Sequence, residues 1–271
     1  MTAPAAVLAS PAVAPGRLDL WLLRAPKADR AASLDLSELD GHERNRAASF
    51  VRPADGLLYA AAHIALRRLL GSYLGVAAQD VPFVREPCPG CGKPHGRPAV
   101  ATPDPPLHFS LSHSGGLALV AVAHTTVGAD LEKLPGAETV AICAEALHPG
   151  ERAELARVPQ TERAELFSRL WTRKEAYLKG LGTGLSRSPS ADYLGSDPAR
   201  RPAGWTITDI PSGPRHSAAV ALKGDAPAET SVRRLPMDWL YADDVKGLFD
   251  ELVRSRPSRT AAPHRRRDAP S

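Results

Sequence analysis

LHFSLSHSGGLALVAVAHTTVGADLEKL, residues 107–134, decides the fold. Its first two apolar runs flank Gly115 and Gly116, a pair typical of a tight turn, which predicts a β-hairpin. The segment 126–134 predicts a further short strand, because its apolar residues alternate with polar ones. This stretch predicts strands only, so any helices come from the sequence before and after it.

The flanking sequence supplies helical patterns in two places. Residues 18–25 predict a strand, and residues 40–75 have helical spacing that Pro53 divides into two helices. Residues 85–106 predict a loop rich in Cys, Pro and Gly. Helical spacing returns over residues 138–182, and strands are predicted within 205–211 and 217–223. Strand, helices, strands thus occur twice, which predicts an α+β fold of two similar subdomains.

The predicted domain plan has four parts. An N-terminal α+β subdomain covers residues 16–125 and a C-terminal one covers 126–250. Residues 1–15 and the basic tail 251–271 have too few apolar residues to order themselves, so we expect both to be disordered.

The net charge belongs mostly to that tail. The chain carries a formal charge of +4, and residues 252–271 hold six arginines against one aspartate. The rest of the chain is close to neutral, so we do not expect a nucleic-acid partner.

Neither a membrane helix nor a signal peptide is expected. No run reaches the ~20 apolar residues of a span, and the opening segment has no basic region before its apolar residues. Three cysteines, Cys88, Cys91 and Cys143, are too few for a disulfide framework. We therefore expect a cytoplasmic protein in a reducing compartment, without a membrane partner.

Two strand segments place polar residues where packing does not require them. His113 follows Ser112 at a strand end beside two glycines, where a ligand can approach the backbone; the alternative is a histidine that caps the turn. Asp130 and Glu132 are two residues apart, so they share one face of a strand. They repel each other unless a cation lies between them, and carboxylate oxygens suit Mg²⁺; the alternative is a solvated face.

The third segment is FSRLWTRKEAYLKGLGTGL, residues 167–185, which predicts a helix ended by glycines. Four-residue spacing puts Trp171, Glu175 and Lys179 on one face of that helix. The alternative is an exposed Glu and Lys pair, which stabilises a helix by only about 0.2–0.5 kcal/mol.

Taken together, F-S-L-S-H-S, V-G-A-D-L-E and W-T-R-K-E-A-Y-L-K resemble the signature set of the surfactin-type (Sfp-type) 4′-phosphopantetheinyl transferases, over roughly residues 17–225. The resemblance implies two subdomains in a pseudo-twofold arrangement. It also implies transfer of the phosphopantetheine arm of coenzyme A to a serine of an apo acyl or peptidyl carrier protein, with release of adenosine 3′,5′-bisphosphate. A monomer that serves polyketide and nonribosomal peptide biosynthesis is expected.

The resemblance also assigns roles to residues. Asp130, Glu132 and Glu175 would bind Mg²⁺, Glu175 would be the general base, and Lys179 would stabilise the departing phosphate. His113 would contact the coenzyme A phosphates and is counted as catalytic with Glu175 and Lys179. The residues implied in coenzyme A binding are Arg46, Arg52, Arg97, Ser112, His113 and Lys179.

The sequence leaves several points open. Leu58 stands near a position where members of the family often carry an arginine. This departure leaves open how tightly the adenine end of coenzyme A binds. The carrier proteins and the tolerance for acyl-coenzyme A are equally undefined. Two alternatives of other classes are an inactive binding module for coenzyme A or a carrier protein, and a metal-dependent pyrophosphate hydrolase.

The segment CPGCGKPHG contains three possible zinc ligands, Cys88, Cys91 and His95. Structural zinc takes four ligands, and no fourth is evident among Cys143 or the other histidines. We therefore interpret the segment as a Gly/Pro loop that positions Arg97.

Overall fold

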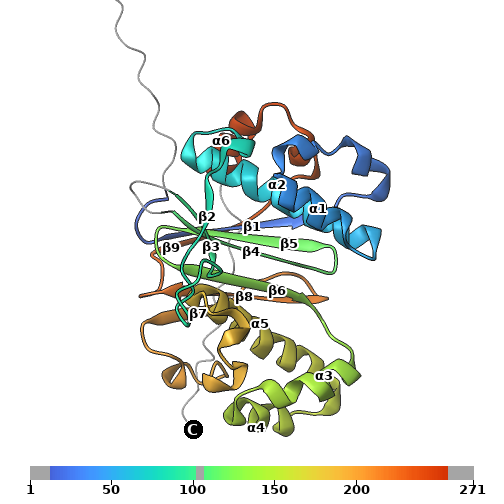
Figure 1. Cartoon of the computed structure of the whole chain (residues 1–271). Helices are drawn as coiled ribbons and strands as arrows, with labels where there is room; N and C mark the ends of the chain where they lie inside the picture. Colours follow the sequence, from blue (N-terminus) through green and yellow to red (C-terminus); the bar gives the residue numbers. More distant parts are fainter. Residues whose placement is uncertain (1–12, 102–106, 256–271) are drawn as a thin grey trace, which may run out of the picture.

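Two sheets form the centre of the protein, as seen in a computed structural model that describes residues 13–101 and 107–255 (Figure 1). The first sheet has the strand order β4-β5-β1-β9, in which β9 pairs parallel with β1 and the other pairs are antiparallel. Its strands are β1 (Arg17–Arg24), β4 (His108–Ser114), β5 (Leu117–Ala123) and β9 (Glu229–Arg234).

The second sheet is antiparallel and has the order β6-β8-β7. Its strands are β6 (Val127–Lys133), β7 (Trp205–Asp209) and β8 (His216–Lys223). Alternate apolar residues of the two sheets meet in one buried cluster, with Leu20 and Leu119 from the first sheet and Leu131 and Val220 from the second. The sheets are therefore stacked face to face.

Helices cover the outer face of each sheet (Figure 1). The first sheet carries α1 (Gly41–Ala48), α2 (Pro53–Leu74) and α6 (Val245–Arg254), and the second carries α5 (Arg163–Leu181), with α3 (Ala137–Cys143) and α4 (Pro149–Arg157) beyond it. A separate two-stranded sheet joins β2 (Phe83–Arg85) to β3 (Pro98–Val100). The α+β class expected from the sequence is confirmed.

Local sequence signals explain the element ends. Pro53 occupies the first turn of α2, where its missing N–H costs nothing, and Gly75 ends that helix with φ +72°. Gly115 and Gly116 form the β4–β5 turn at φ +57° and +86°. Gly182, at φ +76°, ends α5 as the glycine-rich sequence predicts.

The helical stretch predicted over 138–182 contains three α-helices. Two expectations differ from the structure. The predicted loop 85–106 contains β3, which pairs with β2. Val13, expected in a disordered N-terminus, is buried in the core of the first half. The rest of that predicted segment, 1–12, lies outside the described residues, as does 256–271 of the predicted tail.

The C-terminal segment returns to the first half of the molecule. Strand β9 joins the first sheet, and Phe249 of α6 is fully buried 5.7 Å from the ring of Trp21. Residues 229–254 thus pack outside the C-terminal subdomain predicted for 126–250. Residues 251–254, predicted as disordered tail, form the last turn of α6, because its apolar face has a partner in the first half.

None of the helices in the described part of the chain combines the length and the hydropathy that a membrane span requires.

Candidate active site

Strand β4 at the edge of the first sheet is joined to β6 at the edge of the second sheet by hydrogen bonds from alternate residues. Ser110 accepts a hydrogen bond from the backbone N–H of Ala129 at 2.9 Å, and Ser114 accepts one from Lys133 at 3.2 Å. Between them, Ser112 donates to Oδ1 of Asp130 at 2.9 Å. Residues two apart share a face of a strand, so the serines of F-S-L-S-H-S all meet β6.

Strand β6 turns its polar face towards α5. Ala129 and Leu131 pack between the sheets, so Gly128, Asp130 and Glu132 occupy the opposite face. A methyl group at Gly128 would overlap the carbonyl oxygen of Ala176 and the amide nitrogen of Gly180, so only glycine fits there. This close approach brings α5 onto the carboxylates.

Asp130 is the centre of the acidic group. Its side chain is buried, and Oδ1 accepts from Ser112 and lies 2.7 Å from Nζ of Lys179. Oδ2 is buried as well and has no hydrogen-bond partner among the described residues. A buried carboxylate oxygen without a partner is costly, which indicates that a further positive group belongs beside it.

The pKa values of Glu132 and Glu175 are shifted by their surroundings. Burial, followed by the charge of Asp130, raises the pKa of Glu132 and also that of Glu175. Lys179 opposes both shifts, because its charge favours the ionised carboxylates. The three carboxylates lie in one electrostatic neighbourhood, although in the described chain they do not each bring an oxygen within 4.8 Å of the others.

A hard divalent cation fits this group of side chains. The partner-free Oδ2 of Asp130 offers a ligand atom, and a cation would reverse the repulsion that raises the pKa of Glu132 and Glu175. All the donors are carboxylate oxygens, which favour Mg²⁺ or Ca²⁺ over softer metals.

A cavity of about 590 Å³ lies next to the acidic group. This volume falls within the range of about 300–1,000 Å³ that is typical of small-molecule sites. Its walls come from α1 and α2, the β2–β3 segment, β4, and the C-terminal end of α5 with the glycines that follow. The side chains that line the cavity include Tyr59, His63, Phe83, Arg85, Arg97, Phe109, His113 and Lys179.

The cavity is lined by cations, aromatic rings and two carboxylates, Asp40 and Glu43, which are paired with Arg67. Arg97 is held by Glu86 at 2.8 Å and donates to the carbonyl of Gly180, at the end of α5, at 2.9 Å. Tyr59 stacks on His63 with ring centroids 4.0 Å apart and meets His113 edge-on at 5.7 Å. Such a wall suits an anionic ligand with a flat ring.

The surroundings of His113 disfavour its charged form. Burial lowers the pKa of its imidazole, and the charges of His63 and Lys179 lower it further. An anion bound beside it would oppose these charges and raise the pKa.

The structure brings most of the predicted residues together. His113, Arg97 and Lys179 line the cavity, Asp130 contacts Lys179, and the charges of both act on Glu132 and Glu175. Ser112 is not on the cavity wall, since it binds Asp130.

Two predicted arginines lie elsewhere. Arg46 is exposed on α1 over the ring of Phe50, and Arg52 is exposed at the N-cap of α2; neither lines the cavity. Leu58 is 3% exposed and packs into the core of the first half, and it does not line the cavity.

Sequence reasoning missed Arg85, Tyr59 and His63. The spacing of four between Tyr59 and His63 on one helix was an available signal for a shared face. For Arg85 no pattern existed, because the three-residue strand that carries it is too short to show alternation.

The chain is similar in sequence to known 4′-phosphopantetheinyl transferases. The model of the 4′-phosphopantetheinyl transferase superfamily matches residues 126–221, which contain β6 and α5. The 4′-phosphopantetheinyl transferase HetI of Nostoc is 34% identical over 203 residues, 72% of this chain and 81% of that protein. A 4′-phosphopantetheinyl transferase of Bacillus subtilis is 36% identical over 94 residues, 34% of this chain and 40% of that protein. The enzyme AcpT of Escherichia coli is 39% identical over 99 residues, 36% of this chain and 50% of that protein.

The cavity beside an acidic group and the similarity to these relatives define the class: the chain belongs to the 4′-phosphopantetheinyl transferase superfamily. It is an enzyme that transfers a 4′-phosphopantetheine arm to carrier proteins.

Proposed function

We propose that Asp130, Glu132 and Glu175 hold the Mg²⁺ of this transferase and that the adjoining cavity binds coenzyme A. One observation carries the proposal: Lys179 lines the cavity and at the same time lies 2.7 Å from Asp130. A phosphate group that reaches Lys179 is therefore next to the acidic group. When bound, the ion neutralises charge on the pyrophosphate of coenzyme A.

Glu175 is proposed as the general base. It takes the proton from the serine hydroxyl of the carrier protein while the serine oxygen attacks the β-phosphorus of coenzyme A. The C-terminal half of α5 carries Glu175 to the acidic group, where the charge of Asp130 acts on it, and this placement supports the role.

Lys179 is proposed to neutralise the leaving group. The bond from the β-phosphorus to the bridging oxygen breaks, and adenosine 3′,5′-bisphosphate departs with the bonding electrons. The lysine is one third exposed, so it reaches the cavity as well as Asp130.

Arg85, Arg97 and His113 are proposed to bind the phosphate groups of coenzyme A. All three line the cavity, and each offers an N–H donor. Ser112 supports this site through Asp130. Binding by Arg46 and Arg52 stays a prediction from the resemblance alone.

The finer features of the family are proposals too. A pseudo-twofold arrangement is supported by the repeated unit of one long helix, α2 or α5, on one sheet. A monomer in the cytoplasm, and a role in polyketide and nonribosomal peptide biosynthesis, rest on the resemblance.

Intact-protein mass spectrometry of an apo carrier protein tests the proposal. After incubation with this protein, coenzyme A and Mg²⁺, we expect the carrier to gain the mass of one phosphopantetheine arm, and EDTA to prevent the gain. Adenosine bisphosphate release without a carrier would instead indicate a hydrolase. If several apo carriers gain no mass while coenzyme A binds to the folded protein, only the binding-module alternative survives.

A further inference from the structure

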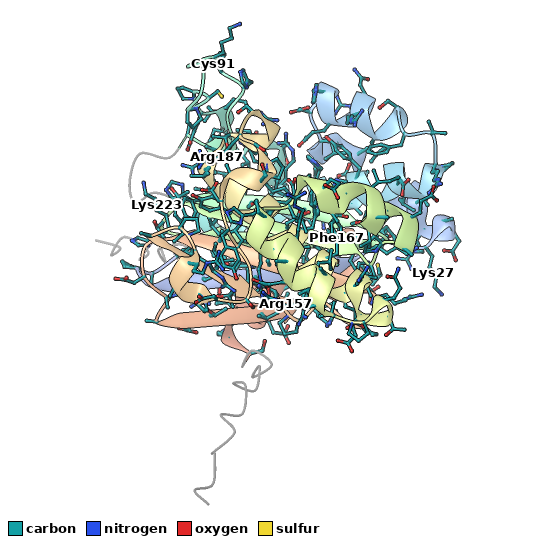
Figure 2. All side chains as sticks on the ribbon, turned by 90° about the horizontal axis from the view of Figure 1, so that it is seen from below. Lys27, Cys91, Arg157, Phe167, Arg187 and Lys223 are labelled. Atoms are coloured by element: carbon teal, nitrogen blue, oxygen red, sulfur yellow. The ribbon has the colours of Figure 1, made fainter. Side chains whose placement is uncertain are left out.

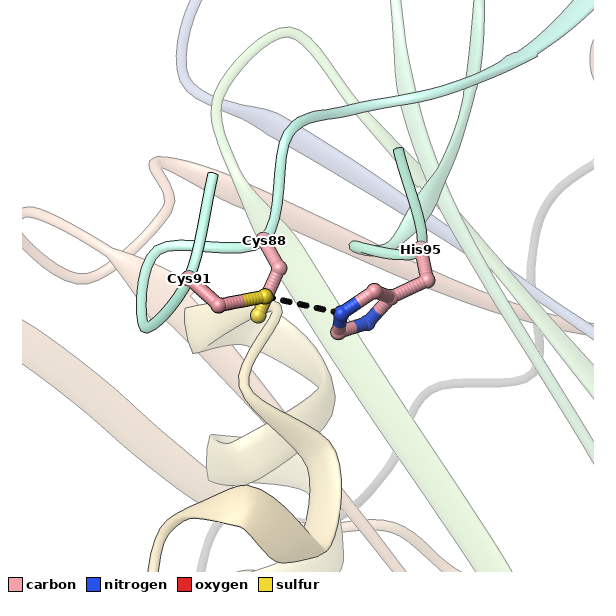
Figure 3. A group of neighbouring side chains, drawn as sticks. All are labelled: Cys88, Cys91 and His95. Atoms are coloured by element: carbon pink, nitrogen blue, oxygen red, sulfur yellow. Dashed lines mark hydrogen bonds between the residues drawn. The ribbon is translucent and has the colours of Figure 1, made fainter. Parts of the chain in front are cut away.

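A second cluster of ligand-type side chains lies at the border of the cavity, apart from the acidic group. Cys88, Cys91 and His95, on the loop between β2 and β3, bring one ligand atom each within 4.8 Å of one another (Figure 3). Sγ of Cys91 is 2.9 Å from Nε2 of His95. Within the described ranges this is the one group of three His, Cys, Asp or Glu side chains that is so compact.

The backbone of the loop is folded to hold the two sulfurs together. The carbonyl of Cys88 accepts from the amides of Cys91, at 3.3 Å, and Gly92, at 2.8 Å, and the Cys88 amide donates to Lys93 at 2.8 Å. Gly92 turns the chain back at φ +71°, a conformation that favours glycine. The turn is thus set before any ligand binds.

The chemistry of the three side chains selects the metal. Two thiolates and an imidazole are soft and borderline donors that favour Zn²⁺ and reject Mg²⁺. A tetrahedral zinc with bonds of about 2.0–2.3 Å sets its ligand atoms about 3.3–3.8 Å apart, a spacing the cluster reaches with small side-chain shifts.

We propose that Cys88, Cys91 and His95 form a zinc site with a water molecule as the fourth ligand. The fourth position is open because Cys91 and His95 are exposed, while Cys88 is buried beneath them. In Figure 2, Cys91 lies at a projecting tip of the molecule, well away from Phe167 in the first half of α5. The site is separate from the acidic group, whose donors are all oxygen atoms.

The zinc has a structural consequence for the cavity. His95 and Arg97 both line the cavity, and the segment between them is tied to Glu86 by backbone bonds of 2.9 and 3.1 Å. Arg97 in turn binds Glu86 and the carbonyl of Gly180. A metal on His95 therefore fixes the loop that holds Arg97 against the end of α5, so the ion positions an anion-binding residue without touching the reacting atoms.

Metal analysis of the full chain tests the site directly. Protein purified under reducing conditions, incubated with Zn²⁺ and dialysed, is expected to retain one zinc per chain. Cys91→Ser, at an exposed position, is expected to lose it, and Cys143→Ser is the matched control that retains it. In the unsubstituted protein loaded with Co²⁺, we expect the intense thiolate-to-cobalt absorption, which Cys91→Ser should remove.

Activity gives a second, independent readout. If zinc positions Arg97, Cys91→Ser should raise the KM for coenzyme A severalfold and change kcat much less. Absence of bound zinc and of the cobalt absorption in the unsubstituted, reduced protein overturns the site. A Cys88–Cys91 disulfide under those same conditions overturns it as well. Because metal content, cobalt absorption and the disulfide state do not need transfer activity, they separate failure of the zinc site from failure of the proposed function.

Discussion

At the scale of single residues, the site depends on the glycine that precedes the acidic pair. Gly128 is the contact point between β6 and α5, because any side chain there would meet the backbone of Ala176 and Gly180. The G-x-D-x-E spacing is therefore one structural unit: the glycine admits the helix, and the two carboxylates that follow on the same face meet it.

Gly128→Ala is expected to displace α5 from the carboxylates. We expect a loss of about 1–3 kcal/mol in the free energy of unfolding, typical of overpacking, and a fall in transfer rate of at least tenfold. Gly136→Ala is the matched control, since a methyl group there meets nothing within 4 Å. Equal behaviour of the two variants in denaturant unfolding and transfer assays would contradict this role.

His113 offers a test of anion binding that does not depend on turnover. Its pKa lies below the ordinary value in the free protein, because of burial and nearby positive charge, and phosphate groups of coenzyme A should raise it. An NMR titration of the imidazole with and without coenzyme A measures the shift. An unchanged or lower pKa in the complex would exclude phosphates from this part of the cavity.

At the scale of elements, α5 is anchored by a buried ion pair. Lys174 is about 1% exposed and lies 2.7 Å from Glu151 of α4, and it also donates to the carbonyl of Asp192 at 2.8 Å. In the motif W-T-R-K-E-A-Y-L-K, the first lysine therefore holds the helix in place, and the lysine four residues after Glu175 reaches the site.

Lys174→Met should leave Glu151 buried without its partner. Removing one member of a buried pair costs about 3–5 kcal/mol, so we expect a loss of that order in the free energy of unfolding. Arg169→Met, at an exposed position on the same helix, should change it by less than about 0.5 kcal/mol. Comparable chemical denaturation curves for the two variants would refute the anchoring role.

Local signals in the sequence predicted the elements well. Pro53, Gly115, Gly116 and Gly182 end or divide elements through their own backbone preferences, and alternation placed Asp130 and Glu132 on one face. Arg85 was missed, because its place in the cavity depends on how a short hairpin packs against a distant helix.

At the scale of the whole molecule, the C-terminal segment of the chain packs against the N-terminal half. Strand β9 pairs with β1 across more than two hundred residues, and no local pattern near either strand signals that partner. The predicted boundary at residue 250 failed to anticipate this return for the same reason.

Phe249→Ala tests how much the packing of the C-terminal segment against the first half stabilises the protein. The ring is fully buried beside Trp21 and Tyr73, so its loss should cost about 3–5 kcal/mol in the free energy of unfolding. Removal of residues 256–271, which lie outside the described structure, should leave stability and transfer activity unchanged. A truncated protein as unstable as Phe249→Ala in thermal unfolding would show that the tail contributes to the fold.

The central claim is that the acidic group beside Lys179 performs the transfer, and Glu175→Gln tests it most directly. The measurement is the rate of carrier-protein modification at saturating Mg²⁺ and coenzyme A, with Glu165→Gln, an exposed position on the same helix, as the control. We predict a fall of at least about 10²-fold for Glu175→Gln, with the Kd for coenzyme A changed far less and the control unaffected. A Glu175→Gln enzyme that turns over at the unsubstituted rate would remove Glu175 from the chemistry and contradict the account.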